Sequence, residues 1–264
     1  MTDKLEDWIG RTRTQVARVE PELLRRYAAA VGSAPEAFPP LGHWALFNDA
    51  VAPGDLGPDG HPHKGLFLPP VSLPRRMFAS ASLTFAAPIL PGEDAELVST
   101  IADLRRRSGR TGELVLVDVE RRLNQGGDLR LSELQTIVYR EAGEATAAVA
   151  EIEGGPGELW RPNSVDLFRF SAATFNSHRI HYDQSYVREV EGYPDLVVHG
   201  TFTASRLFDL ATRTAGAPLT AFGFRALAPL FVDQPVRLRP GNEPNSVVAV
   251  RCDGAVAMSA AWEA

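Results

Sequence analysis

The sequence predicts an α+β protein whose antiparallel strands and helices occur in two similar halves. Three observations support this fold class. Four segments between residues 80 and 141 alternate apolar and polar residues and are separated by turn sequences. A long amphipathic segment near residue 200 has helical periodicity. Two stretches of the first half also reappear, weakly but in the same order, roughly 140 residues later, which indicates a tandem duplication.

The first half is expected to open with helix and to continue as sheet. Residues 4–32 have a helical pattern, with Pro21 at a helix start. Residues 34–74 are rich in proline and glycine and lack periodicity, which predicts a loop with short elements. Little room is left between Lys64 and Ser82 for a long central helix. Antiparallel strands are then predicted at 80–90, 95–108, 113–125 and 131–141, with turns at GRTG and GGD.

The second half is expected to contain the long helix. Small residues, glycine and proline dominate the stretch before it and predict a linker. Residues 200–214 form the amphipathic helix, which ends at Gly216. Strands are predicted in 219–241, 245–254 and 255–264. The predicted organisation is therefore an N-terminal repeat at 1–145, a linker at 146–162 and a C-terminal catalytic repeat at 163–264.

The duplicated segments differ in their chemistry. Residues 23–37 align without gaps with residues 167–181, which places Gly32 opposite Asn176 and Ala37 opposite His181. The polar side chains occur only in the second copy. This predicts one active site in the second half, and a first half that is structural or holds the ligand.

Composition restricts the partners and the compartment. The formal net charge of -6 and the pI of about 5.6 argue against nucleic acid or an anionic membrane as the main partner. Cys252 is the single cysteine, so no intrachain disulfide forms and a reducing compartment is expected. The first residues lack the apolar core of a signal peptide, and no apolar run is long enough to span a membrane. We expect a cytoplasmic protein.

One stretch concentrates the chemistry. FSAATFNSHRIHYDQSY (170–186) places Asn176, His178 and His181 within six positions among aromatic residues, although the chain has only six histidines. This stretch resembles the MaoC-like hydratases and dehydratases, whose loop reads Asp-x-Asn-Pro-Ile/Leu-His and is followed about 17 residues later by a His-Gly pair. Here Asn176 stands in the Asp position, and the pair is His199–Gly200. The resemblance implies a double hotdog fold and an acyl-CoA substrate, with coenzyme A as part of the substrate and no further cofactor.

Two further stretches narrow the resemblance. EGYPDLVVHGTFTA (191–204) and LPPVSLPRRMFA (68–79) are similar to the subgroup that includes hydratases of C5 dicarboxylic mono-CoA thioesters, such as itaconyl-CoA and mesaconyl-C4-CoA, which yield citramalyl-CoA. Such a substrate carries a free carboxylate, and arginine suits it because its planar fork can meet both oxygens. Arg179 is the first candidate, because it lies inside the motif. The other candidates are Arg75, Arg76 and Arg206.

Hydration of a C=C bond conjugated to a thioester needs a base for water, donors for the enolate oxygen and a proton for the α-carbon. His181 is the predicted base, since imidazole titrates near neutrality. Asn176 cannot take a proton but can orient the water through its amide. The Gly200 N–H, at a helix start, is predicted to stabilise the enolate oxygen. His178 and His199 are predicted to line the site or support it. No metal is expected, since His61–His63 has no carboxylate or cysteine at metal-binding spacing.

Other functions stay open at this point. An (R)-3-hydroxyacyl-thioester hydratase or dehydratase of fatty-acid metabolism would favour a long apolar tunnel. A non-catalytic acyl-CoA-binding hotdog subunit is a second alternative, which the presence of His181 and Asn176 opposes. A hotdog thioesterase would depend on Asp209, which lies late in the predicted helix. A homodimer is compatible with each of these readings.

Overall fold

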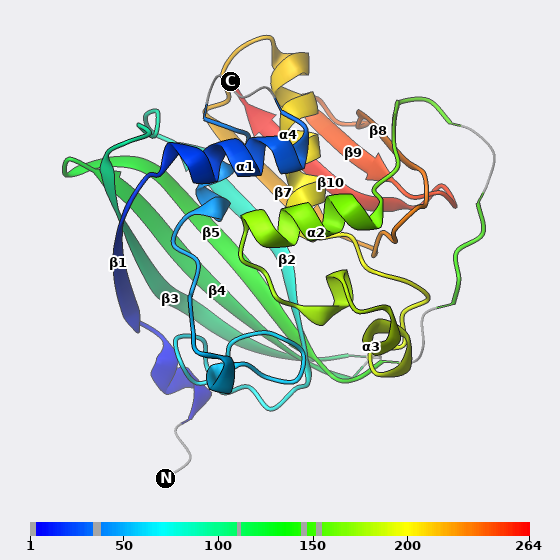
Figure 1. Cartoon of the computed structure of the whole chain (residues 1–264), viewed down its shortest axis with the longest axis horizontal. Coiled ribbons are helices and arrows are strands. Elements are labelled where there is room, and N and C mark those ends of the chain that lie inside the picture. The colour runs from blue at the N-terminus through cyan, green and yellow to red at the C-terminus, as the bar shows by residue number, and fades with distance from the viewer. Residues whose placement is uncertain (1–3, 34–37, 110–111, 144–146, 152–154) are drawn as a thin grey trace.

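The computed structural model of the chain describes residues 4–33, 38–109, 112–143, 147–151 and 155–264. Strands in these residues form one antiparallel sheet in the order β1-β3-β4-β5-β2-β7-β10-β9-β8-β6 (Figure 1). The strands are β1 (Thr12–Arg18), β2 (Arg75–Phe85), β3 (Asp94–Gly109), β4 (Gly112–Gln125), β5 (Asp128–Arg140), β6 (Glu158–Trp160), β7 (Ala221–Ala226), β8 (Val236–Pro240), β9 (Ser246–Val250) and β10 (Val256–Glu263). The α-helices are α1 (Pro21–Val31), α2 (Ser164–Ala173), α3 (Gln184–Glu189) and α4 (Gly200–Ala215).

The strand order repeats. From the outer edge inward, the first half reads β1-β3-β4-β5-β2 and the second half reads β6-β8-β9-β10-β7. Each half therefore places its first, third, fourth, fifth and second strands in the same sequence. The two sheets meet where β2 pairs with β7, with Ala81 opposite Phe224. The expected side-by-side joining of two antiparallel sheets is confirmed.

The long helix belongs to the second half alone. Helix α4 lies across β7–β10 (Figure 1), and its buried side chains, including Phe202, Leu207 and Ala211, join the main apolar core. It ends at Gly216, whose φ of 68° closes the helix in the left-handed conformation. The predicted helix at 200–214 is thus confirmed.

In the first half, an extended segment occupies the face of the sheet. Residues 38–74 contain only short 3₁₀ turns, so the expected lack of a long helix there is confirmed. Val71 and Leu73 pack against Ile101, Val117 and Tyr139 and form a second apolar cluster. The segment covers the long strands of the first half and lies near the catalytic motif of the second.

The start of the first half differs from the prediction. The expected helix over 4–32 is wrong for residues 12–18, which form β1 and pair with β3; α1 begins at Pro21 as predicted. Pairing at the sheet edge has overridden local helical propensity.

The division at 1–145, 146–162 and 163–264 stays a prediction. Strand β6 falls inside the proposed linker, and residues 144–146 and 152–154 lie outside the described residues. Arg110 and Thr111 of the predicted turn also lie outside them. None of the helices in the described residues is both long and apolar enough to span a bilayer.

Candidate active site

A cavity of about 1460 Å³ lies between the two halves and contains the predicted catalytic motif. Its walls come from the 38–74 segment, from strands of the first half, and from residues 168–203 of the second half. Asn176, His178, His181, His199 and Gly200 all line it. The structure therefore brings together the five second-half residues that the motif singled out.

His181, the predicted base, is held in its neutral form. It lies in a 3₁₀ turn (Arg179–His181) after α2, and only 7% of it is exposed. Its Nδ1 atom lies 2.7 Å from the carbonyl oxygen of Val197, and a carbonyl can only accept, so Nδ1 carries the proton. Burial lowers the pKa of His181 to about 4, although the bond to Val197 opposes this. The other nitrogen, Nε2, is left as an unprotonated acceptor.

Asn176 is oriented by its own loop. Its side-chain Oδ1 accepts a hydrogen bond from the His178 backbone N–H at 3.0 Å, and its backbone N–H donates to Ser171 at 2.8 Å. These bonds assign the oxygen, and the Nδ2 amino group has no hydrogen-bond partner among the described residues. The preceding Phe175 has a φ of 49°, a strained conformation for a non-glycine residue. The amide can therefore donate to a water molecule whose proton His181 accepts.

The start of α4 completes the second-half part of the site. The His199 ring stacks on the His181 ring, with centroids 3.6 Å apart, and its Nε2 lies 2.8 Å from the Ser171 hydroxyl. Gly200 is the first residue of α4, and its N–H makes no hydrogen bond within the described residues. A Cβ at Gly200 would meet only ordinary contacts at 3.9 Å, so packing inside the protein does not require glycine there. A glycine there also leaves the free N–H open to close approach by another group.

A pair of residues from the first half also faces this site. Asp59 and His61 are hydrogen-bonded to each other, and the His61 ring lies 4.0 Å from the His178 ring, centroid to centroid. Burial of His178, together with the nearby His61 and His181, holds its pKa far below the usual value. Sequence reasoning missed Asp59, because residues 59 and 178 are far apart along the chain and the segment has no periodicity. The adjacent DGH sequence was the available signal.

One cluster of side chains concerns the prediction that the protein binds no metal. The donor atoms of Asp59, His61 and His178 lie within 4.8 Å of one another. The stated reason for that prediction, the lack of a nearby carboxylate, is therefore wrong. The Asp59 Oδ2 to His61 Nδ1 distance is 2.9 Å, which is a hydrogen-bond length. Two ligands of a tetrahedral zinc ion lie about 3.4 Å apart, given metal–ligand bonds of about 2.1 Å. We describe the pair as a hydrogen-bonded dyad.

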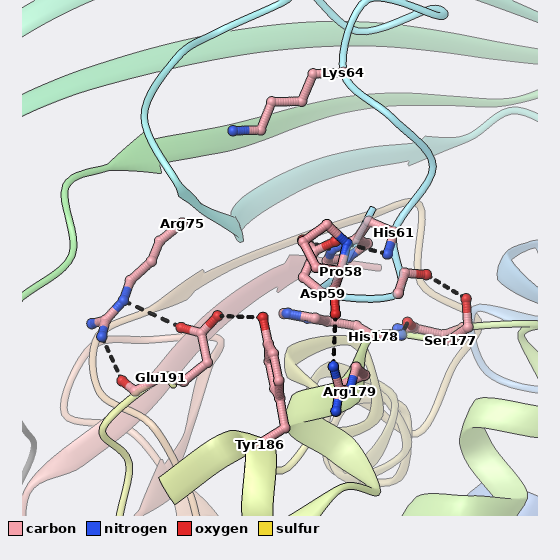
Figure 2. A network of polar contacts seen from close by, with 12 residues as sticks. Pro58, Asp59, His61, Lys64, Arg75, Ser177, His178, Arg179, Tyr186 and Glu191 are labelled. Carbon is pink, nitrogen blue, oxygen red and sulfur yellow. Dashed lines mark hydrogen bonds and ion pairs between the residues drawn. The ribbon is translucent and has the colours of Figure 1, made fainter. Parts of the chain in front are cut away.

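The four candidate arginines have different environments. Arg179 is bound to Asp183 at 2.8 Å and covers the Tyr186 ring. It also donates to the Pro58 carbonyl at 3.0 Å (Figure 2). Arg75 pairs with Glu191 at 3.2 Å. Arg206 binds Glu158 at 3.0 Å and the Val31 carbonyl. None of these three lines the cavity, whereas Arg76 does.

Arg76 is the one of the four candidate arginines that lines the cavity. It makes no ion pair with a described acidic residue. Burial is the main cause that lowers the pKa of His61 and of His178, and the positive charge of Arg76 lowers both further. Arg76 therefore lies near the two histidines and has its charge available to an anion in the cavity.

Comparison with known proteins identifies the family. The family model described as hydroxyacyl-thioester dehydratase type 2 matches residues 41–232. A mesaconyl-C(4)-CoA hydratase of Chloroflexus aurantiacus is 41% identical over 97% of this chain and 96% of its own length. The chain belongs to the hydroxyacyl-thioester dehydratase type 2 family. It is accordingly an enzyme of the hydro-lyase class. A mitochondrial family member from Schizosaccharomyces pombe is 30% identical over 42% of this chain and 39% of its own length.

Solved structures support the fold. HtdX of Mycobacterium tuberculosis superposes with a TM-score of 0.70 at 18% identity and covers 96% of this chain and 99% of its own. A MaoC-like dehydratase from Phytophthora capsici gives 0.69 at 14% identity, over 99% of this chain and 97% of its own. A further Mycobacterium tuberculosis protein, described as having a double hotdog fold, gives 0.57 at 14% identity, over 98% and 96%. The double hotdog fold expected from the resemblance is confirmed.

Proposed function

We propose that this enzyme hydrates the C=C bond of a C5 dicarboxylic mono-CoA thioester, mesaconyl-C4-CoA or itaconyl-CoA, to citramalyl-CoA. The similarity to the Chloroflexus aurantiacus hydratase over almost the whole chain supports this substrate class. Itaconyl-CoA carries its double bond one carbon further from the thioester. A base near the α-carbon could shift that bond into conjugation before water is added.

The geometry supports a mechanism of water addition. His181 Nε2 takes a proton from the water that the Asn176 amide orients, and the hydroxyl oxygen bonds to the β-carbon. Electrons of the double bond move to the thioester oxygen, which the N–H of Gly200 at the positive end of α4 stabilises. The resulting enolate then receives a proton at the α-carbon.

Arg76 is the observation that carries the substrate proposal. A dicarboxylic substrate brings a carboxylate next to the carbon that receives water, and burying it without a partner would cost several kcal/mol. Arg76 lines the cavity close to His61 and His178 and is not paired with a described acidic residue. Arg179, the first candidate on sequence grounds, has its guanidinium occupied by Asp183 and Pro58.

The alternative activity, on fatty (R)-3-hydroxyacyl thioesters, has an observation of its own. Much of the cavity wall is apolar, including Phe78, Val119 and Ile137, and the family model is described as a hydroxyacyl-thioester dehydratase. An acyl chain without charge would lie against these side chains and would make no use of Arg76.

Kinetics on crotonyl-, mesaconyl-C4- and itaconyl-CoA separate the two activities. We expect Arg76→Gln to lower kcat/KM for the dicarboxylic substrates by about ten- to a hundredfold, corresponding to about 1.5–3 kcal/mol for a hydrogen bond to a charged group. The loss on crotonyl-CoA should be small. Arg26→Gln, on the exposed face of α1, is the control. Equal losses on all three substrates would favour the fatty-acyl activity.

We also propose that the enzyme needs no metal or organic cofactor and that it forms a homodimer. We propose further that it acts in the cytoplasm, in the degradation of itaconate. The single cysteine supports a reducing compartment. Light scattering of the purified protein tests the assembly.

A further inference from the structure

Asp59 and His61 form a closely fixed pair in the first half. The Asp59 carboxylate accepts the backbone N–H of His61 at 3.0 Å through Oδ1 and lies 2.9 Å from the ring Nδ1 through Oδ2. Because an ionised carboxylate can only accept, Nδ1 carries a proton in this pair. The Nε2 atom has no hydrogen-bond partner among the described residues, and the ring lines the cavity.

The pair continues a series of imidazoles that reaches the predicted base. The centroid of the His61 ring lies 4.0 Å from that of His178, which lies 5.4 Å from that of His181. All three rings line the same cavity. His61 and His178 lie against each other in Figure 2, although they come from opposite halves of the chain. His61, a residue of the first half, therefore lies beside the second-half histidines of the predicted catalytic motif.

Backbone contacts fix this arrangement. The Ser177 hydroxyl donates to the Gly60 carbonyl, and the Arg179 N–H donates to the Asp59 carbonyl at 2.9 Å. The Arg179 guanidinium adds a bond to the Pro58 carbonyl (Figure 2). Residues 58–60 are thus attached directly to residues 177–179, which carry the motif. Attachment through backbone atoms places the His61 ring reproducibly at the cavity wall.

The proposed hydration also requires a proton for the α-carbon of the enolate. The His181 imidazolium formed from water is one source of this proton, and the amide of Asn176 is not an acid. We propose that His61, held by Asp59, is the second acid–base residue and gives this proton. This inference rests on the proposed hydratase function and assigns a catalytic group to the first half.

The protons that the enzyme gains and loses in this step are equal in number. Hydration begins with His181 neutral and His61 protonated on both nitrogens, with Asp59 as its counter-charge. His181 gains the proton of water while the C–O bond forms, and His61 Nε2 loses its proton to the α-carbon as the enolate electrons form the C–H bond. The extra proton then returns from His181 to His61 through water in the cavity beside His178. The substrate has gained one water molecule, and the enzyme is unchanged.

Among the three imidazoles, His61 is the suitable carrier of the extra proton. It alone of the three has a carboxylate partner in the described residues. Burial lowers the pKa of His61, and the hydrogen bond from its ring to Asp59 opposes part of that lowering. His178 has no such compensation from a hydrogen bond, and the His181 ring donates only to a neutral carbonyl.

The test uses the full-length protein with crotonyl-CoA and mesaconyl-C4-CoA as probes. His61→Asn keeps an amide N–H near the Nδ1 position for Asp59 but removes Nε2. We expect its kcat to fall at least a hundredfold, with KM within threefold of the wild-type value and an unchanged melting temperature. Asp59→Asn should move the alkaline limb of the kcat profile to lower pH by at least one unit, because protonated His61 loses its counter-charge. Asp55→Asn, in the same segment but outside the cavity lining, is the matched control.

Two results would overturn the assignment. One is a His61→Asn protein whose kcat stays within threefold of the wild-type value. The other is a pH profile of Asp59→Asn that runs parallel to the wild-type profile, since that pattern belongs to a pair that only holds the loop. If the wild-type protein hydrates neither probe, the proposed function fails instead, so the two failures are distinguishable.

Discussion

The Nδ1 atom of His181 donates to the carbonyl oxygen of Val197 across 2.7 Å. Val197 is itself fixed, because its N–H donates to the Ile180 carbonyl at 3.0 Å. The backbone next to the base therefore sets which nitrogen of the imidazole is free. With the His199 ring stacked on its face, His181 has one orientation in which its lone pair meets the cavity.

Replacing this base should abolish most of the activity. His181→Ala is expected to lower kcat for hydration by about 10²–10⁴-fold, the usual contribution of a positioned general base. Steady-state kinetics on the best substrate, with circular dichroism to verify folding, measures this. Near-normal turnover by a folded His181→Ala protein would show that another group activates the water.

Asn176 offers a more specific test. Asn176→Asp keeps the acceptor for the His178 N–H and restores the residue usual at this position in MaoC-like hydratases, so measurable activity should remain. Asn176→Ala loses the water donor and the loop bond, and its kcat should fall about a hundredfold or more. The comparison is made on kcat for both variants. An alanine variant as active as the aspartate variant would remove Asn176 from the mechanism.

The contact between the halves can be broken at one glycine. A Cβ at Gly60 would lie 1.9 Å from the Ser177 carbonyl oxygen, and the φ of +87° is unfavourable for alanine. Gly60→Ala should therefore displace residues 58–61, lower the melting temperature and reduce kcat together. Gly54→Ala, in the same segment with open space at its Cβ position, should change neither. Calorimetry and kinetics of both variants decide this, and a fully active Gly60→Ala protein would contradict the rigid attachment.

Stability should fall as the solution becomes mildly acidic. His181 has a folded-state pKa of about 4 against an ordinary value of 6.5, so the unfolded chain binds a proton between these values and the folded protein does not. The stability is present above pH 6.5 and is lost as the pH falls towards 4. His181 alone accounts for about 3 kcal/mol, at about 1.4 kcal/mol per pKa unit. Thermal melting from pH 7.5 to 4 measures the slope, which should be smaller in a folded His181→Gln protein.

Metal removal should leave the enzyme active. The Asp59–His61 pair is closed by a hydrogen bond, and opening it for an ion would separate Asp59 from the ring. We expect an unchanged kcat after dialysis against a chelator, and less than one zinc per ten chains by elemental analysis. Loss of activity that zinc restores would assign Asp59, His61 and His178 as ligands.

Local patterns predicted the elements whose signals are continuous in the chain. The helix at 200–215 has a complete apolar stripe and a terminal glycine, and β4 and β5 alternate across a two-glycine turn. Strand β1 was missed because its seven residues stand between helical patterns and gain their structure by pairing with β3. Its pairing partner begins at residue 94, so no local window contains both.

In the site, too, residues close together in the sequence were predicted and residues brought together only by folding were not. The roles of Asn176, His178 and His181 could be proposed from one motif, because their spacing is local. Arg179 stays a predicted ligand for the substrate, and Asp183 four residues later was the visible signal of the ion pair that the structure shows. Asp59 and His61 could not be placed from the sequence, since only the folded chain brings residues 58–60 against 177–179.

The segment 38–74, which stands where the second half has its long helix, contributes many of the side chains that line the cavity, including Trp44, Leu46 and Leu66. The predicted base, His181, and the amide of Asn176 lie on other elements. Substitutions in this segment away from residues 58–61 can therefore change which acyl groups are accepted while the reaction itself is preserved. Such substitutions allow descendants of one duplicated ancestor to differ in the thioesters they accept. Protein engineering can change substrate range at the same positions.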